Sequence, residues 1–268
     1  MRVLFGPVRT VCLALLSVAQ ESTGVPAAAM TMGCPQPDST EIMLDGARGA
    51  TTLSIATGGD LVLSALAFPT APGEGDASGL DGAASILADF RARPVRLATD
   101  GVPDRYDRRH AYVYAADGRL LQAELVAAGL AIVRPDGTPP DCVRALLALE
   151  ATARKAGLGL WQDSRIVGNA MEESSLSARN GLYGLVEGRV VSIGYGSRLV
   201  FVDFGRNHRT DFTVMMQNGL IPRLREAGIS LESLSGRAVR VRGVIEESGG
   251  PAIRIADPFA LELLDRTE

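Results

Sequence analysis

The strongest constraint on the fold is the alternation within residues 104–115, which read DRYDRRHAYVYA. Ala111 and Val113 alternate with Tyr112 and Tyr114, so the two pairs point to opposite faces of an extended chain. Asp117-Gly118 follows as a turn signal. These residues therefore predict a strand over 109–115 that packs against a core and ends in a turn.

Short strands mixed with helices are expected around this segment. Strands are predicted at 53–55, 61–63 and 94–98, and a hairpin turn is predicted at Thr57-Gly58-Gly59-Asp60. Apolar spacing predicts helices at 81–90, 122–128 and 141–156, and Gly129 and Gly157 follow the last two as helix stops. Residues 69–80 are rich in Pro, Gly, Asp and Ser and predict a loop. This pattern is typical of a small barrel with helices packed on it.

The C-terminal part predicts a second barrel. Residues 164–180 are expected to be a helical linker. Strands are expected at 184–191, 198–204, 211–216, 238–246 and 252–255, with one helix at 222–227. The expected fold class is therefore α+β: an OB-fold-type barrel with helices over 41–163, followed by a small OB-like barrel over 181–265.

The N-terminus predicts export. Arg2 and Arg9 precede the apolar run 11–19, and small residues follow at 25–29, which is typical of a signal peptide over 1–29. Residues 30–40 are then an N-terminal tail, and the location is periplasmic or secreted, with no transmembrane segment after cleavage. Cleavage removes two arginines and one glutamate and changes the net charge from −4 to −5, which argues against a strongly basic nucleic-acid binder.

Two cysteines remain after such a cleavage. Cys12 would be removed, leaving Cys34 and Cys142. In an oxidising compartment the two can pair and tie the tail to the helix that contains Cys142, or they can remain two free thiols.

Three stretches carry a resemblance to a known family. They are DRYDRRHAYVY at 104–114, LVAAGLA at 125–131 and EATARKAGLGLW at 150–161. In this order and at these distances, residues 42–163 resemble the thermonuclease (staphylococcal-nuclease-like) family. The resemblance implies an OB-type barrel and a Ca²⁺-dependent nuclease, in which carboxylates hold the ion, two arginines stabilise the phosphoryl charge and a glutamate assists the attacking water.

Most of the residues that this chemistry needs are replaced. Thr51 stands where the family's DGDT motif has its metal aspartate. In the stretch that resembles the family's RLxGIDxPE motif, Val62 replaces the arginine, Ala67 the second aspartate and Thr70 the glutamate. Asp45, Asp60 or Glu41 would have to form a relocated metal site.

Arg108 and Tyr106 are the remnant of the implied site. The resemblance gives Arg108 the role of the family's second phosphate-binding arginine, and its planar fork suits phosphate. The alternative is a surface ion pair with Asp104 or Asp107. Tyr112 and Tyr114 follow the strand alternation and are expected to be packing residues.

The second barrel resembles the C-terminal module of exported thermonuclease-like proteins, on the residues VEGRV at 186–190, DFTV at 211–214 and GRAVRVRG at 236–243. Arg237, Arg240 and Arg242 are candidates for a basic, ligand-binding stripe. The alternative is that Arg240 and Arg242 are the outward half of an ordinary strand alternation.

The leading hypothesis is an exported, catalytically degenerate thermonuclease-like protein that acts as a binding or scaffolding module, with no confident catalytic residue, metal or cofactor. The first alternative is a metal-dependent endonuclease or phosphodiesterase for DNA or RNA that uses Ca²⁺ at a relocated site. The second is a nucleic-acid or nucleotide binder without cleavage, whose affinity would fall with salt. A protein partner is also open, and the sequence names none of these ligands.

Overall fold

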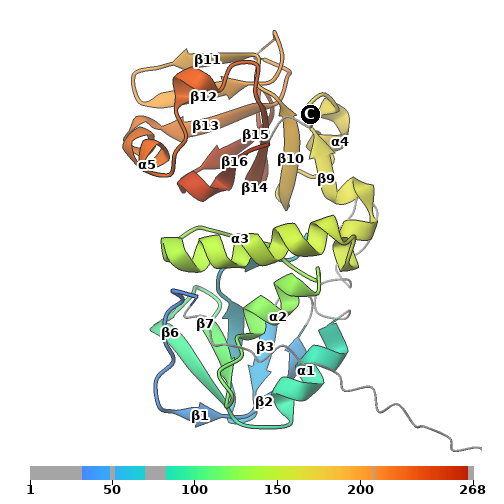
Figure 1. The fold of residues 1–268 in the computed structure, drawn as a ribbon, viewed down its shortest axis with the longest axis vertical. Helices are drawn as coiled ribbons and strands as arrows, with labels where there is room; N and C mark the ends of the chain where they lie inside the picture. Colours follow the sequence, from blue (N-terminus) through green and yellow to red (C-terminus); the bar gives the residue numbers. More distant parts are fainter. Residues whose placement is uncertain (1–31, 49–51, 70–82, 208, 265–268) are drawn as a thin grey trace, which may run out of the picture. The chain divides into compact units, whose positions relative to one another are not determined.

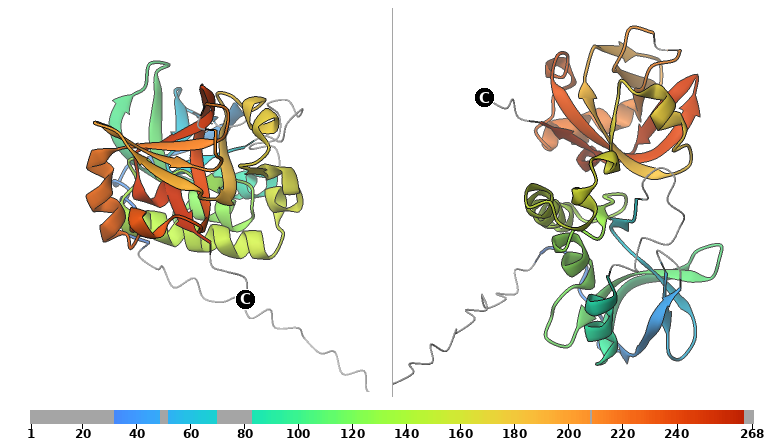
Figure 2. Two further views of the ribbon diagram at one scale, coloured as in Figure 1. Left: turned by 90° about the horizontal axis from the view of Figure 1, so that it is seen from above. Right: turned by 90° about the vertical axis from the view of Figure 1, so that its right-hand side faces the viewer.

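The computed structural model describes residues 32–48, 52–69, 83–207 and 209–264. Residues 31–268 belong to one compact unit. Within it, two barrels follow one another along the chain (Figures 1 and 2). The predicted signal peptide, Thr51, Thr70 and most of the predicted loop at 69–80 lie outside the described residues.

The first barrel is built on a six-stranded sheet. Its strands are β1 (Glu41–Ile42), β2 (Leu44–Arg48), β3 (Thr52–Ile55), β4 (Asp60–Leu63), β6 (Val95–Pro103) and β7 (Arg108–Ala115). Their order is β1-β6-β7-β4-β3-β2. All pairs are antiparallel except β4 with β7, which run parallel. A separate pair joins β5 (Leu66–Ala67) to β8 (Ile132–Val133).

Three helices cover this sheet: α1 (Ala84–Arg91), α2 (Leu121–Ala127) and α3 (Pro140–Lys155). The bounds of α2 and α3 are within one residue of those predicted. Cys142, Val143, Leu146, Glu150 and Ala153 of α3 are buried at spacings of one to four residues, which places them on one face. Cys142, Val143 and Leu146 pack with the strands in a single core, while Glu150 is a charge within that buried face.

The second barrel has strands β10 (Tyr183–Arg189), β11 (Ser192–Tyr195), β12 (Leu199–Asp203), β13 (Thr213–Gln217), β14 (Ala238–Ser248) and β15 (Gly250–Ile255), with helix α5 (Ile221–Glu226). Their order is β11-β12-β13-β15-β14-β10. Only two residues separate the end of β10 from the start of β11, so the two act as one bent strand. This strand occupies both ends of the strand order, and the barrel is therefore closed. A second core fills it.

The two barrels share one topology. Counting β10 with β11 as a single strand, each has the strand order 1-2-3-5-4, a parallel pair between strands 3 and 5, and a helix between strands 3 and 4. The predicted fold class, two OB-type barrels in an α+β chain, is confirmed.

The predicted helical linker is wrong in part. Residues 164–180 contain β9 (Val167–Asn169) and the short helix α4 (Glu173–Ser177). Strand β9 pairs in parallel with β10 and extends the second sheet, and β16 (Leu261–Leu263) pairs with β14. The segment alternates too briefly for its extended part to be distinguished from a helix by pattern.

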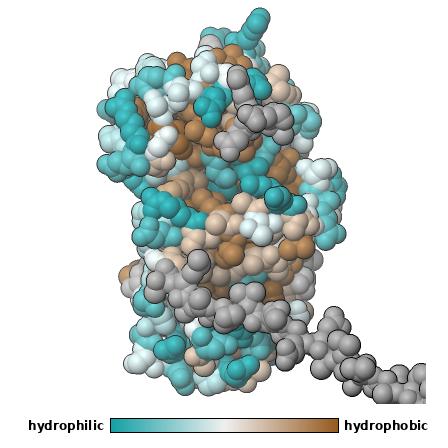
Figure 3. Space-filling view, in the orientation of Figure 1, coloured by the Kyte–Doolittle hydropathy of each residue, from teal (hydrophilic) through white to brown (hydrophobic). Residues whose placement is uncertain are grey.

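In the part of the chain that the structure describes, no helix is both long enough and apolar enough to cross a membrane. Figure 3 shows the face of the molecule that is turned to the viewer in Figure 1. Hydrophilic side chains cover much of it, and apolar side chains are visible at the level of α3.

Candidate functional site

Arg108 is held by an ion pair at the turn between β6 and β7. Its Nε and one terminal nitrogen donate to Asp104 Oδ2 at 2.9 and 2.7 Å. Asp104 Oδ1 accepts from the backbone N–H groups of Tyr106 and Arg108. The bonded Arg108 guanidinium, with these amides, lowers the pKa of Asp104 to about 2. A phosphate would therefore compete with a carboxylate that already occupies the fork of Arg108.

Tyr106 lies at the tip of the same turn. It is 61% exposed, and the guanidinium carbons of Arg105 and Arg108 lie 4.7 and 5.0 Å from its ring centroid. A cation–π contact of this kind stabilises by about 0.5–1 kcal/mol at an exposed site. The turn itself depends on Asp107, which adopts a φ of 60°, a conformation that aspartate tolerates better than most residues.

A cleft of about 540 Å³ opens beside strands β4, β6 and β7. Val62 of β4 lies opposite His110 of β7 in the parallel register, and both line the cleft together with Ser64, Tyr112 and Thr138. The loop after β8 adds Arg134 and Asp136, whose Nε and Oδ2 are 3.3 Å apart. Pro35 and Gln36 from the N-terminal segment supply a further wall. Arg108 and Tyr106 are not among the lining residues.

Ala67 lies in an apolar cluster. It is 7% exposed and packs with Ile132 of β8 and with Leu185, which belongs to β10 of the second barrel. Leu160, Trp161, Val167 and Tyr183 complete the cluster. A carboxylate at position 67 would be desolvated here unless a cation accompanied it.

The three acidic residues considered for a relocated metal site lie on different strands. Glu41 is on β1, Asp45 is on β2, which follows β1 after a single residue, and Asp60 is on β4. Asp60 lies 3.4 Å from Arg48, and its Oδ1 is buried without a hydrogen bond among the described residues. No group of three or more His, Cys, Asp or Glu suited to a metal occurs in the described part of the chain.

The expectation that Arg240 and Arg242 face outward is wrong. They are 6% and 1% exposed, because α3 of the first barrel covers this face of β14. Arg242 donates to both carboxylate oxygens of Glu150 on α3 at 2.9 and 3.0 Å and to the Val133 carbonyl at 2.8 Å. It also contacts Glu262.

The network extends from Arg242 to its neighbours. Arg240 binds Glu187 and Glu262, and Arg154 lies 3.5 Å from Glu150. Burial by itself would raise the pKa of Glu262, but Arg242 and Arg240 outweigh it and hold the pKa below its usual range. Arg240 and Arg242 therefore form ion pairs with carboxylates inside the protein. Of the three arginines in the proposed basic stripe, only Arg237 is partly exposed.

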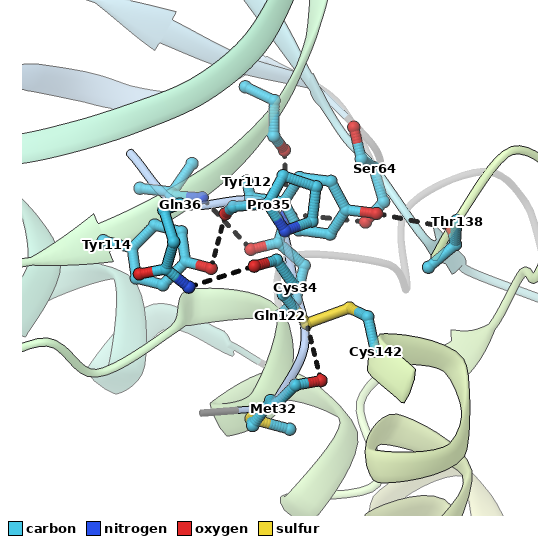
Figure 4. Close-up of a disulfide and its surroundings, with 12 residues drawn as sticks. Met32, Cys34, Pro35, Gln36, Ser64, Tyr112, Tyr114, Gln122, Thr138 and Cys142 are labelled. Carbon is cyan, nitrogen blue, oxygen red and sulfur yellow. Dashed lines mark hydrogen bonds between the residues drawn. A yellow bond between two sulfur atoms is a disulfide. The ribbon is translucent and has the colours of Figure 1, made fainter. Parts of the chain in front are cut away.

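Cys34 and Cys142 are joined in a disulfide, the pairing that the sequence left open. Figure 4 shows this bond between the N-terminal segment and the start of α3, with Tyr112 and Tyr114 beside it. Cys34 is 5% and Cys142 0% exposed.

A family model for staphylococcal nuclease homologues matches residues 83–163. Over this part of its length the chain is similar to the staphylococcal nuclease homologues. A search of curated proteins finds no match for the chain.

All three stretches that carried the predicted resemblance lie inside the matched residues 83–163. The predicted replacements of the family's metal aspartates at Thr51 and Ala67, of its arginine at Val62 and of its glutamate at Thr70 all lie before residue 83 and outside the match. The match therefore supports the family on the residues that form β6, β7 and α1 to α3, and it gives no support to a metal site.

Sequence reasoning missed the cleft residues of the first barrel, above all His110, Arg134 and Asp136. No motif spacing links them, because they meet only through the strand register and the loop after β8. The Glu150–Arg242 pair was also missed, although one signal was present: Glu150 follows Val143, Leu146 and Leu147 on the apolar face of its predicted helix.

Proposed function

We propose that the protein is an exported binding or scaffolding module, built on a nuclease-homologue domain that has lost metal-dependent cleavage. The observation that carries this proposal is the surroundings of Ala67. This position corresponds to a metal aspartate of the family, and its side chain is packed against Leu185 of the second barrel. A divalent ion needs several oxygen ligands and access for water and substrate.

The state of Arg108 supports the same proposal. Its guanidinium is bonded in a two-pronged manner to Asp104, so that the charge which would stabilise a phosphoryl group is already neutralised. Val62, at the position of the family's other arginine, offers only a methyl surface to the cleft. Without a metal and two free arginines, little remains to stabilise the charge that develops in phosphodiester hydrolysis.

Export is supported by the signal-like residues 11–29 and by the Cys34–Cys142 disulfide, since disulfides persist in oxidising compartments. The intact mass of the protein recovered from the periplasm and from the medium of an expressing bacterial culture tests this. A mass that corresponds to cleavage near Ala29 supports export, and full-length protein in the cytoplasm alone contradicts it.

Loss of cleavage is tested by incubating the purified protein with DNA and with RNA in Ca²⁺, Mg²⁺ or Mn²⁺, with a chelator control. Any cleavage is measured against Arg108→Ala, which removes the remnant arginine, and against Arg225→Ala, an exposed arginine paired with Glu232. We expect no metal-dependent cleavage. Robust cleavage that Arg108→Ala abolishes and Arg225→Ala leaves intact would overturn the proposal.

One observation favours the alternative of a relocated metal site: Oδ1 of Asp60, on the strand that pairs with Arg108, is buried and has no hydrogen bond among the described residues, although Arg48 lies 3.4 Å from it. If cleavage is found, Asp60→Asn decides whether this carboxylate takes part. Binding without cleavage is measured separately by fluorescence anisotropy with a labelled oligonucleotide over a salt series, in which affinity should fall steeply with salt if phosphates are contacted.

A further inference from the structure

The N-terminal segment of residues 32–38, here called the strap, forms one wall of the cleft. Pro35 and Gln36 of the strap line it, opposite Val62 and His110. The disulfide from Cys34 to Cys142 anchors the strap to the first turns of α3. Figure 4 shows Pro35 and Gln36 beside Tyr112 and Tyr114 of β7.

Besides the disulfide, the strap is held by the packing of Met32 and Cys34 on the core of the first barrel and by two hydrogen bonds. Tyr114 Oη donates to the Pro35 carbonyl at 2.8 Å, and the Asp38 N–H donates to the Leu97 carbonyl at 3.0 Å. The side-chain amide of Gln36 donates to the Cys34 carbonyl, within the strap. Ordering a segment costs conformational entropy at every residue, and two hydrogen bonds with the packing of Met32 offset little of that cost over seven residues. The covalent bond therefore decides whether the strap stays in place.

The strap also fits tightly against α3. At Gly33, which has a φ of 63°, a Cβ atom would lie 2.4 Å from Asp141 Cβ. This close approach lies next to the disulfide that joins the strap to the start of α3. Tyr112 and Tyr114 are 6% and 7% exposed, Tyr114 contacts the strap at the Pro35 carbonyl, and burial raises the pKa of Tyr114 to about 12.

We propose that the cleft is an oxidation-dependent site, in which the Cys34–Cys142 bond holds the strap as a wall and its reduction frees the strap and opens the cleft. Reduction by a dithiol breaks the S–S bond with two electrons and two protons. It leaves thiols at Cys34 and Cys142 and converts the dithiol to its disulfide. This inference does not depend on the loss of nuclease chemistry.

We expect both barrels to remain folded in the reduced protein, because most of the contacts that hold them lie outside the strap. Strands β6 and β7 pair along their length, and α3 is held by its apolar face and by the Glu150–Arg242 pair. Release of the strap is thus a local opening, of the kind that occurs at weakly packed termini.

Tyrosine nitration of the full chain, mapped by mass spectrometry, reports the opening. The chain has five tyrosines. Tyr106 and Tyr195 are 61% and 62% exposed and should react in every sample. Tyr183, on β10 of the second barrel, is half-buried, has a raised pKa and packs against the guanidinium of Arg134. It should therefore react slowly in both the oxidised and the reduced protein. Tyr114 should change from protected to reactive when the strap is released.

The comparison is between the oxidised protein and the paired variant Cys34→Ser with Cys142→Ser. We expect the nitration rate of Tyr114 to rise by about tenfold or more, and the hydrogen-exchange protection of the Asp38 amide to fall by a similar factor. Oxidised wild-type protein treated with dithiothreitol provides the second measurement, and it decides the matter if the variant does not fold.

An unchanged Tyr114 rate and an unchanged Asp38 amide in reduced protein would overturn the proposal, because the strap would then be held without the disulfide. Loss of amide protection in both barrels on reduction would overturn it as well, because the disulfide would then support the whole fold. A matched variant, Tyr114→Phe in the oxidised protein, should leave the Asp38 amide protected.

Discussion

Replacing Arg242 with methionine should destabilise the protein strongly. The change removes two hydrogen bonds to Glu150, one to the Val133 carbonyl and the contact with Glu262. Glu150 is 0% exposed, and it keeps only Arg154 at 3.5 Å and the Val133 N–H at 2.6 Å. Removing one partner of a buried pair leaves a charge without compensation and costs about 3–5 kcal/mol.

Urea unfolding of the variant should show this loss as a lower midpoint at a nearly unchanged slope. For a unit of this size the corresponding fall in Tm is roughly 6–20 °C. Arg225→Met is the matched control: the ion pair of Arg225 with Glu232 is about 60% exposed on both sides, so its loss should change stability by less than about 0.5 kcal/mol.

The double variant Arg242→Met with Glu150→Gln separates the charge from the packing. Glutamine keeps an oxygen for the Val133 N–H and removes the uncompensated charge, so the double variant should be more stable than Arg242→Met alone by about 1–3 kcal/mol. The reasoning is refuted if Arg242→Met loses less than about 1 kcal/mol, or if Glu150→Gln makes that variant less stable.

Three further predictions concern the first barrel. The lowered pKa of Asp104 means that its ion pair stabilises the fold above the usual carboxyl pKa and loses this effect as the pH falls toward 2; Asp104→Asn should flatten acid unfolding over that window. Gly129→Ala should destabilise more than Gly118→Ala, as thermal unfolding will show, because both have positive φ but only at Gly129 would a Cβ meet a backbone oxygen, at 2.2 Å. Removing Cys34–Cys142, which closes a loop of 108 residues, should lower the free energy of unfolding by at most about 4–5 kcal/mol; a larger loss in urea unfolding would show that the bond does more than restrict the unfolded chain.

Much of the fold could be predicted because its signals are local. The alternation at 109–115 specifies a strand, and β7 spans Arg108–Ala115. The apolar spacing before Gly157 specifies a long helix, and α3 spans Pro140–Lys155. Each signal depends on a period of two or 3.6 residues that the backbone imposes. The segment 164–180 carried no such period, and β9 was missed there.

The candidate site could be predicted only where the family motif supplied it. Arg108 was identified, and its alternative role as the partner of Asp104 is what the structure shows. His110 and Arg134 line one cleft because a parallel strand pair and a loop bring them together. No spacing along the chain encodes that meeting.

The sequence by itself determined the two barrels and their main helices. Only the tertiary structure decided that Arg240 and Arg242 are buried, that Glu150 pairs with a residue 92 positions away, and that Ala67 packs against the second barrel. The physical reason is that alternation shows which side chains share a face of a strand, but not what covers that face. Here α3 of the first barrel covers β14 of the second, and an apparently outward arginine becomes one of the most deeply buried side chains in the described part of the molecule.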